Sequence, residues 1–152
     1  VGYAFSSDGD HLTQPRGDGA VRAMRQALRQ AKVSPGEVEY INAHATATPV
    51  GDRIEGLSIL DVFGRNGPPV SSTKSMTGHE CWMAGASALV YSMLMMRDGF
   101  LAPNINLEAL EPELEGLAVV RETQMRRPRV VLSNSFGFGG TNAALLLKAF
   151  ER

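Results

Sequence analysis

Two histidines of this 152-residue chain occupy positions from which they could support chemistry. His44 follows the predicted strand Val38–Ala43, and His79 follows the predicted strand Val70–Thr73 after a short loop. In open α/β sheets, reactive groups gather beyond the carboxyl ends of the strands, so one shared site is a reasonable hypothesis. Two unrelated surface histidines are the alternative, and position alone favours that alternative.

Lys74 lies between a strand end and His79, at the edge of an apolar region. A desolvated lysine either has a lowered pKa or pairs with a carboxylate. Glu55 is the natural partner, because it lies one turn into the helix that follows the His44 loop. A structural ion pair and a catalytic lysine both fit this spacing, and the two roles are compatible.

Thr46 and Thr48 alternate in a predicted extended stretch, so both hydroxyls can point the same way. Such a pair could hydrogen-bond the amide groups of a ligand. Threonines that cap a turn are the alternative, and that interpretation is preferred if the pair stands alone.

The loop from Phe136 to Gly140 contains three glycines around Phe138. Glycine allows backbone conformations in which bare N–H groups face an anion, as in an oxyanion hole. A plain hairpin turn is the default interpretation, although hairpins rarely place an apolar residue between glycines at the tip. A dinucleotide site is not predicted, because the loop runs into a predicted strand rather than a helix.

Cys81 is the single cysteine, so an internal disulfide framework is excluded. It lies two residues after His79, at the predicted start of a helix, where a thiol pKa is lowered. We favour a small buried apolar role, because residues two apart on a helix point to different faces. His44, His79 and Cys81 lack a compact ligand spacing, so no metal site is expected.

Three helices are predicted to position these residues: Asp18–Ala31, Arg53–Phe63 and Glu80–Met96. The second is predicted to be capped by Asp52 and to bury Ile54, Leu57 and Leu60. The third is apolar nearly all round, which predicts a central buried helix that ends at Gly99.

Later strands are predicted at Leu117–Arg121, Val130–Phe136 and Ala143–Phe150. Strands that alternate with helices predict an α/β layered fold with a mixed sheet that closes in an antiparallel pair.

Composition narrows the class of protein. The net charge is −1, from 15 basic and 16 acidic residues, so no nucleic-acid partner is expected. No apolar stretch reaches the length of a membrane span, and a cytoplasmic protein is expected. The chain starts without methionine, and Val1–Phe5 reads like the end of a strand, which predicts one part of a longer protein.

Three motifs, in this order, resemble the C-terminal half of the β-ketoacyl-acyl carrier protein synthases: Asn42–Asp52, Ser72–His79 and Ser133–Asn142. The likeness covers essentially the whole chain, and the segments Gly99–Asn106 and Val119–Thr123 look most like the synthase I type. The resemblance implies the thiolase-like layered fold, in which two similar α/β halves pack around central buried helices. Residues 1–152 are then the second half, and the nucleophilic cysteine belongs to an absent first half.

The resemblance also implies residue roles. His44 and His79 bind the thioester carbonyl and assist decarboxylation of a malonyl unit. Lys74 pairs with Glu55 in an ordering network. The remaining residues hold the phosphopantetheine arm (Thr46 and Thr48), donate an oxyanion N–H and gate the acyl pocket (Phe138), or line the same site (Phe136).

The implied activity is decarboxylative Claisen condensation of an acyl thioester with malonyl-acyl carrier protein, in fatty-acid or related lipid or polyketide synthesis. It implies acyl carrier protein as partner, a homodimer, and no metal or redox cofactor. This chain alone is expected to be inactive. A non-catalytic partner subunit like a chain-length factor is the alternative, and a thiolase acting on acyl-CoA is a third.

The chain departs from the family pattern at Glu80, Trp82 and Met83, which are bulkier than the usual residues beside His79. Cys81 in the same segment does not take the place of the family's nucleophilic cysteine. Ala45 replaces the usual glycine, and its methyl group is expected to oppose a positive φ and shift His44.

Overall fold

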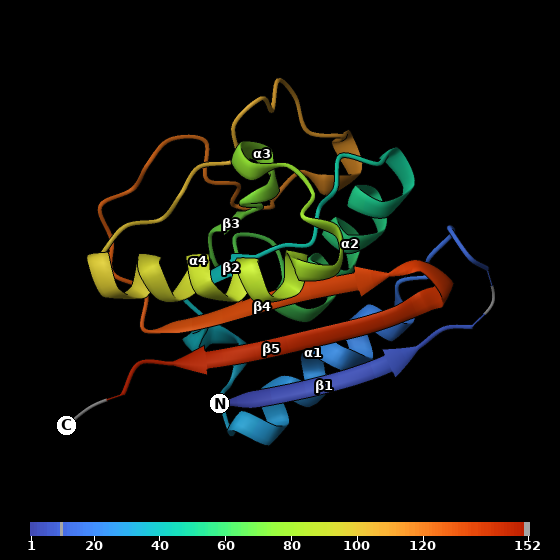
Figure 1. Ribbon diagram of the computed structural model, residues 1–152, viewed down its shortest axis with the longest axis horizontal. Helices are drawn as coiled ribbons and strands as arrows, with labels where there is room; N and C mark the ends of the chain where they lie inside the picture. Colours follow the sequence, from blue (N-terminus) through green and yellow to red (C-terminus); the bar gives the residue numbers. More distant parts are fainter. Residues whose placement is uncertain (10, 151–152) are drawn as a thin grey trace.

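The computed structural model describes residues 1–9 and 11–150 and contains one mixed sheet of five strands (Figure 1). The strand order is β1-β5-β4-β2-β3. The first three strands in that order pair antiparallel, whereas β2 pairs parallel with both β4 and β3. The predicted closing antiparallel pair is therefore confirmed. The bounds are β1 Gly2–Ser7, β2 Tyr40–Asn42, β3 Val70–Ser71, β4 Val130–Gly137 and β5 Thr141–Lys148.

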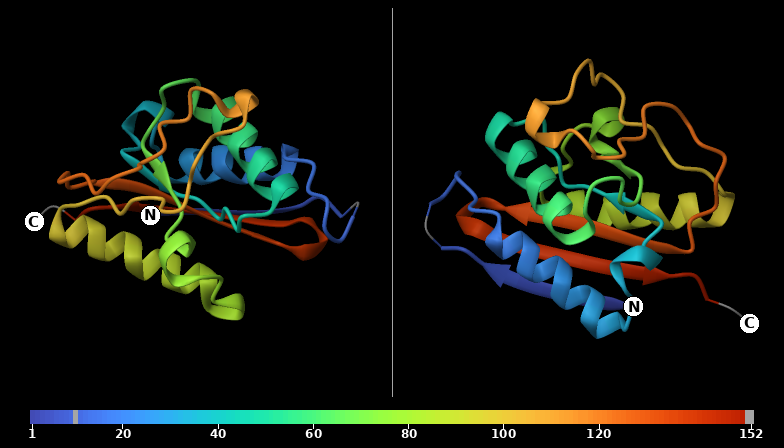
Figure 2. Two further views of the ribbon diagram at one scale, coloured as in Figure 1. Left: turned by 90° about the horizontal axis from the view of Figure 1, so that it is seen from above. Right: turned by 180° about the vertical axis from the view of Figure 1, so that it is seen from behind.

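Helices cover both faces of the sheet. Helices α1 (Asp18–Ala31) and α2 (Pro49–Phe63) lie on one face, and α4 (Ala84–Asp98) lies on the other (Figure 2). A one-turn helix, α3 (Lys74–Thr77), follows β3. The predicted α/β layered fold is confirmed, and α1 spans the predicted residues. None of the helices in the described part of the chain is long and apolar enough to span a bilayer.

The core consists of two apolar layers that share the central strands. Met24 of α1, Ile41, Leu132 and Leu146 are buried in the layer beneath α1 and α2. A second cluster lies around α4 and the segments that follow it: Tyr40, Met95, Leu101, Ala102, Val120 and Val131. Adjacent residues of β4 thus enter different layers, because side chains alternate across a strand. This explains why the three residues that open β4, Val130–Leu132, are all apolar.

Helix α2 differs from the prediction at its start and on its buried face. It begins at Pro49, with Thr48 as the N-cap residue, so Asp52 lies inside the first turn. Its buried residues are Glu55, Gly56, Ser58 and Ile59 instead of the predicted Ile54, Leu57 and Leu60. Gly56 is close to another element, since an added Cβ would lie 2.6 Å from a methyl group of Leu114. The buried face of α2 is therefore set by the close packing of Gly56 against Leu114 and by the buried carboxylate of Glu55. Hydrophobic periodicity predicts neither of these.

Helix α4 begins at Ala84, later than the predicted Glu80, because a 3₁₀ turn (Cys81–Met83) precedes it. It ends at Gly99, as predicted, with a φ of 79°. Only one side is covered: Val90 is 53% exposed and Met93 is 54% exposed. Within the described residues these elements cover only the face toward β4, so the predicted central helix is buried on that side alone and leaves an apolar side exposed.

The segment Leu117–Arg121 is not a strand. It forms a single parallel bridge between Val119 and Val70, with Val120 N–H donating to the Val70 carbonyl over 2.9 Å. β3 has only two residues, so it offers too short an edge for a longer ladder. The last strand ends at Lys148 rather than at the predicted Phe150.

Candidate active site

The structure brings His44, His79 and Phe136 together. The ring centroids of the two histidines are 5.6 Å apart and nearly perpendicular, and the rings of His44 and Phe136 are 6.0 Å apart. His44 follows the carboxyl end of β2, and Phe136 lies near the end of the parallel neighbour β4. His79 comes from the loop between α3 and α4. Residues that are far apart in the sequence thus meet at one edge of the sheet.

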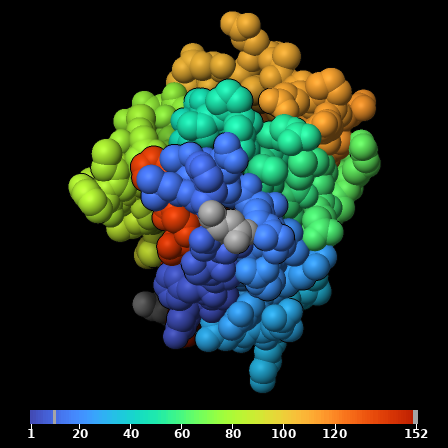
Figure 3. Space-filling model, turned by 90° about the vertical axis from the view of Figure 1, so that its right-hand side faces the viewer, coloured from blue at the N-terminus to red at the C-terminus, as the bar shows by residue number. Residues whose placement is uncertain are grey.

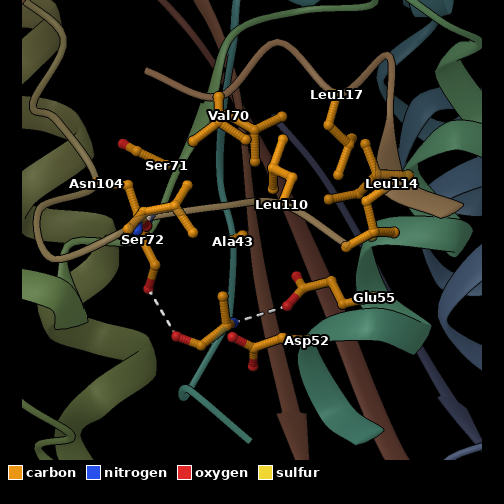
Figure 4. Close-up of a pocket in the computed structure, with 15 residues that line it drawn as sticks. Ala43, Asp52, Glu55, Val70, Ser71, Ser72, Asn104, Leu110, Leu114 and Leu117 are labelled. Atoms are coloured by element: carbon orange, nitrogen blue, oxygen red, sulfur yellow. Dashed lines mark hydrogen bonds between the residues drawn. The ribbon is translucent and has the colours of Figure 1, made fainter. Parts of the chain in front are cut away.

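Glu55 holds the backbone on which His44 sits. Its carboxylate, which is 4% exposed, accepts hydrogen bonds from His44 N–H (2.9 Å), Ala45 N–H (2.7 Å) and the Asn134 side-chain amide (3.1 Å). On the other side, the Ser72 hydroxyl donates to the Ala45 carbonyl over 3.1 Å. Figure 4 draws the bond from Ala45 to Glu55 and the bond from Ser72 to Ala45 as dashed lines. The loop after β2 is therefore fixed from two sides.

The expected pairing of Lys74 with Glu55 is not a direct ion pair. Among the described residues, no contact within 4.0 Å joins an oxygen of Glu55 to the Lys74 ammonium. Burial raises the pKa of Glu55, and hydrogen bonds from Ala45, His44 and Asn134 oppose that shift more strongly than Lys74 does. The carboxylate is occupied by N–H donors, so Lys74 acts on it only at longer range.

The electrostatic environment keeps His44 neutral. Burial lowers the pKa of His44 to about 3, and the charges of Lys74 and His79 add to the shift. Burial also lowers the pKa of Lys74, whereas the carboxylates of Glu55, Glu80 and Asp52 oppose that shift. A neutral imidazole has one N–H donor and one acceptor nitrogen, so at neutral pH His44 can donate a hydrogen bond without carrying charge.

The tautomer of His79 follows from its hydrogen bond. Its Nδ1 accepts the backbone N–H of Cys81 over 2.9 Å. In a neutral imidazole the other nitrogen then carries the proton, so His79 presents Nε2–H as a donor. Cys81 has a φ of 50°, a conformation that few residues other than glycine adopt. Cys81 thus combines an unusual backbone conformation with the N–H that orients the His79 ring.

The prediction of a buried apolar Cys81 is wrong. The cysteine is exposed, and its thiol donates to the His79 carbonyl over 3.7 Å. It belongs to the 3₁₀ turn instead of the helix, so the helical argument about faces does not apply. Trp82 and Met83 in the same turn are also exposed.

Thr46 and Thr48 point to the same side, as predicted, with their hydroxyl oxygens 3.3 Å apart. The residue between them, Ala47, has a φ of 62°, whereas Ala45 has no positive φ. The expected strain at Ala45 is therefore wrong, and the left-handed residue of this loop is Ala47.

Phe138 lies at the tip of the β4–β5 hairpin and is 79% exposed. Gly139 and Gly140 both have a φ of 76°. The segment after β1 holds this tip, because Asp8 N–H donates to the Gly140 carbonyl (2.9 Å) and Gly139 N–H donates to the Leu12 carbonyl (2.9 Å). Figure 3 shows the blue segment after β1 against the red hairpin tip. The loop is a hairpin, and it presents an exposed Phe138 at its end.

Several residues of the site are absent from the predicted set: Ser72, Asn134, and the backbone N–H of Cys81. A signal existed for Asn134, because an amide inside an apolar strand needs a buried partner. The contact between Cys81 and His79 could not be found from sequence, since it depends on an unusual backbone conformation.

A cavity of about 100 Å³ lies behind Glu55 (Figure 4). Leucines line one side of it, and Asp52, Glu55, Ser72 and Asn104 line another part. No cluster of three or more His, Cys, Asp or Glu side chains with the arrangement of a metal site occurs in residues 1–9 and 11–150.

Comparisons with known proteins give one consistent family. Residues 1–108 match the family described as "Beta-ketoacyl synthase, C-terminal domain". Over 151 residues the chain is 47% identical to 3-oxoacyl-[acyl-carrier-protein] synthase 1 of Escherichia coli K12, covering 99% of this chain and 36% of that protein. It is 42% identical over 155 residues to 3-oxoacyl-[acyl-carrier-protein] synthase 2 of Staphylococcus aureus COL, covering 99% and 37%.

Solved structures agree with these relatives. The ishigamide ketosynthase/chain length factor matches with a TM-score of 0.95 and 36% identity, over 99% of this chain and 38% of that one. A beta-ketoacyl synthase from Burkholderia phymatum matches with a TM-score of 0.92 and 36% identity, over 99% and 37%. The chain thus spans a little over a third of the length of the proteins it resembles.

Proposed function

Because this chain belongs to the beta-ketoacyl synthase family through its C-terminal domain, we propose that it is the C-terminal catalytic half of a longer condensing enzyme. The proposed reaction is decarboxylative condensation of an enzyme-bound acyl thioester with malonyl-acyl carrier protein. The observation that best supports it is the geometry of His44 and His79, whose rings are nearly perpendicular with centroids 5.6 Å apart. The positive charge of Lys74 also contributes to the lowered pKa of His44.

The pair supplies what the first chemical step requires. Loss of CO2 from a malonyl thioester breaks the bond between C2 and the carboxylate, and the electron pair moves onto the thioester as an enolate. N–H donors aimed at the thioester oxygen stabilise that charge. The Nε2–H of His79 and a neutral His44 are such donors, and the nearby Lys74 cation disfavours protonation of His44.

In the second step, the enolate carbon attacks the carbonyl of the acyl group bound to a cysteine of the other half. A carbon–carbon bond forms, the carbon–sulfur bond breaks, and the thiolate leaves. The products are a 3-oxoacyl thioester, CO2 and the free cysteine thiolate. Phe136 contacts His44, and we assign it to the wall of the site. We assign the Phe138 N–H as an oxyanion donor for this step, with its ring at the acyl entrance.

Exposed apolar surface supports the proposal that this chain is only one half of a larger fold. Tyr3 and Phe5 project from the uncovered face of β1 and form an edge-to-face pair 6.0 Å apart. Val90 and Met93 are exposed on α4, which covers that same face of the sheet at β4. Apolar surface of this extent is typical of an interface. We therefore assign residues 1–152 to one half of a two-part fold whose other half covers this face.

Acyl carrier protein is the proposed partner. One similar solved structure, at 30% identity, is titled as a type II PKS acyl-carrier protein in complex with its ketosynthase. By analogy, Thr46 and Thr48 would hold the phosphopantetheine arm of the carrier. A homodimer is proposed for the whole enzyme, and no metal or redox cofactor is needed for the steps above.

The experiment measures 3-oxoacyl product formation by the full-length protein and by a His44→Ala variant. Removing one charge-stabilising donor should lower the rate by about 10²–10³-fold. His11→Ala is the matched control, because His11 is exposed and its Nδ1 only accepts the Thr13 N–H, so this variant should keep full activity. Undiminished condensation by His44→Ala would remove the proposed role.

A non-catalytic subunit like a chain-length factor is the second candidate. Two similar solved structures are titled as ketosynthases with chain length factors. A partner subunit needs no decarboxylation centre, whereas this chain retains His44, Lys74 and His79 together. An upstream sequence without a cysteine at a helix N-terminus would favour this candidate over the enzyme.

A further inference from the structure

The position of His79 depends on a short turn between α3 and α4. His79 is exposed, and Gly78 before it has a φ of 78°, with nothing within 4 Å of the place where a Cβ would lie. The bond from Cys81 N–H to His79 Nδ1 lies within the turn itself. It therefore orients the ring relative to the turn, whereas a further contact must hold the turn near His44.

Glu80, the next residue, attaches the turn to α4. Its Oε1 accepts a hydrogen bond from the Tyr91 hydroxyl over 2.8 Å. The Ser87 hydroxyl is a second hydrogen-bond donor to the same carboxylate. Ser87 and Tyr91 are four residues apart in α4, so they lie on one face of the helix in successive turns. A single side chain thus joins the residue after His79 to two turns of α4.

The pKa shifts agree with the direction of these bonds. The hydrogen bonds of Ser87 and Tyr91 lower the pKa of Glu80 against the effect of burial, and Thr77 and the Lys74 charge act in the same direction. The Glu80 carboxylate in turn raises the pKa of Tyr91. At neutral pH Glu80 is therefore ionised and the phenol is protonated, so the phenol donates. Hydrogen bonds to a charged acceptor are stronger than those between neutral groups.

Helix α4 is itself fixed to the strands that carry the other residues of the site, and it lies along β4 (Figure 1). The buried Asn42 side-chain amide, at the end of β2, donates to the Ala88 carbonyl over 3.0 Å, and His44 follows two residues later. On β4, Ser135 lies close to the helix, since a Cβ added at Gly85 would be 3.0 Å from its hydroxyl oxygen. A side chain anchored on α4 is therefore anchored to the same frame as His44.

We propose that Glu80 is a positioning residue that attaches the His79 turn to α4. Its bonds to the helix keep the rings of His79 and His44 at the 5.6 Å separation from which both can face one thioester oxygen. The inference rests on the proposed function, because that oxygen belongs to the malonyl thioester. Glu80 acts on the reaction only through His79, so it should govern the chemical step rather than substrate binding.

The test measures CO2 release from malonyl-acyl carrier protein by the full-length protein and three variants. Glu80→Ala removes both bonds and should lower kcat about tenfold or more with KM within about threefold, because misplacing a catalytic group costs rate rather than binding. Tyr91→Phe removes one bond and should lower kcat about three- to tenfold. Glu80→Gln keeps a side-chain carbonyl oxygen as acceptor, so its kcat should stay within about threefold of the wild type.

Two comparisons make the result specific. Glu113→Ala is the matched control, because it removes an exposed carboxylate that pairs with Arg53, and it should keep the wild-type kcat and KM. The second comparison repeats Glu80→Ala in the His79→Ala background. There it should lower kcat by a further factor of less than about two, because the group that Glu80 positions is gone.

Three results would overturn the inference: an unchanged kcat in Glu80→Ala or Tyr91→Phe, an equal loss in the wild-type and His79→Ala backgrounds, and an equal loss in Glu80→Gln and Glu80→Ala. The second would indicate a general loosening of the site, and the third a role for the charge, which also faces Lys74. If His79→Ala itself releases CO2 at the wild-type rate, the proposed function fails instead. Tyr91→Phe leaves Glu80 in place, so it tests the attachment even if Glu80→Ala does not fold.

Discussion

Glu55 offers a quantitative test of how the site is built. Its buried carboxylate accepts three N–H groups, from His44, Ala45 and Asn134, at 2.7–3.1 Å. In Glu55→Gln the shape is kept, but the charge is lost and an NH2 group faces donors. Hydrogen bonds to charged groups contribute about 1.5–3 kcal/mol each, and an unsatisfied buried donor costs about 1–3 kcal/mol. These losses are not additive, so we expect about 3–5 kcal/mol of local destabilisation.

The assay is amide hydrogen exchange of a peptide that covers residues 43–47 in the full-length protein. A loss of about 3 kcal/mol corresponds to at least 100-fold faster exchange, because each 1.4 kcal/mol is a factor of ten. Lys74→Met should accelerate exchange there by less than tenfold, since Lys74 is not a direct partner of Glu55. Glu113→Gln is the control: this surface carboxylate pairs with Arg53, and its loss should leave the peptide unchanged.

The exchange rates distinguish a Glu55 carboxylate that holds the backbone from one that forms a buried ion pair with Lys74. In a buried ion pair, removing either partner leaves an uncompensated charge and costs about 3–5 kcal/mol. Equal acceleration by Lys74→Met and Glu55→Gln would therefore refute the backbone clamp. Slow exchange in Glu55→Gln would refute it as well.

Three further predictions follow from other contacts. Burial lowers the pKa of His44 to about 3, and the positive charge of Lys74 adds to that shift. In Lys74→Met the pKa should therefore rise in part, and the acid limb of kcat/KM, measured from about pH 3 upward, should move to higher pH; an unmoved limb contradicts this. Tyr40→Phe removes the buried bond between the Tyr40 and Ser71 hydroxyls (2.7 Å) and should lower the free energy of unfolding in urea by about 1–2 kcal/mol; no change argues against that bond. The 152-residue chain alone should self-associate through its apolar face, and Met93→Lys should reduce the size seen by light scattering; a monodisperse wild-type monomer contradicts it.

Local rules predicted much of the architecture. The helix Asp18–Ala31 was recoverable from its apolar spacing, and Gly99 marked a helix end because the backbone there is left-handed. The antiparallel pair of β4 and β5 follows from two apolar runs joined by a glycine-rich turn. These features depend on residues close in sequence, which is where pattern and propensity are informative.

The errors occurred where tertiary contacts decide. The buried face of α2 holds Glu55 because three distant N–H groups need its carboxylate, a demand that no periodicity reports. Leu117–Arg121 has strand-like residues, yet β3 offers only two residues to pair with. Cys81 lies in a 3₁₀ turn instead of the predicted helix, and its backbone N–H orients His79. In each case a polar or backbone requirement of the site overrode hydrophobic pattern.

The most direct test of the decarboxylation centre is CO2 release from malonyl-acyl carrier protein by the full-length protein and its His79→Ala variant. The Nε2–H of His79 is assigned to the enolate oxygen, so its loss should slow CO2 release by about 10²–10³-fold. Release at the wild-type rate by His79→Ala would contradict a centre built on the two histidines.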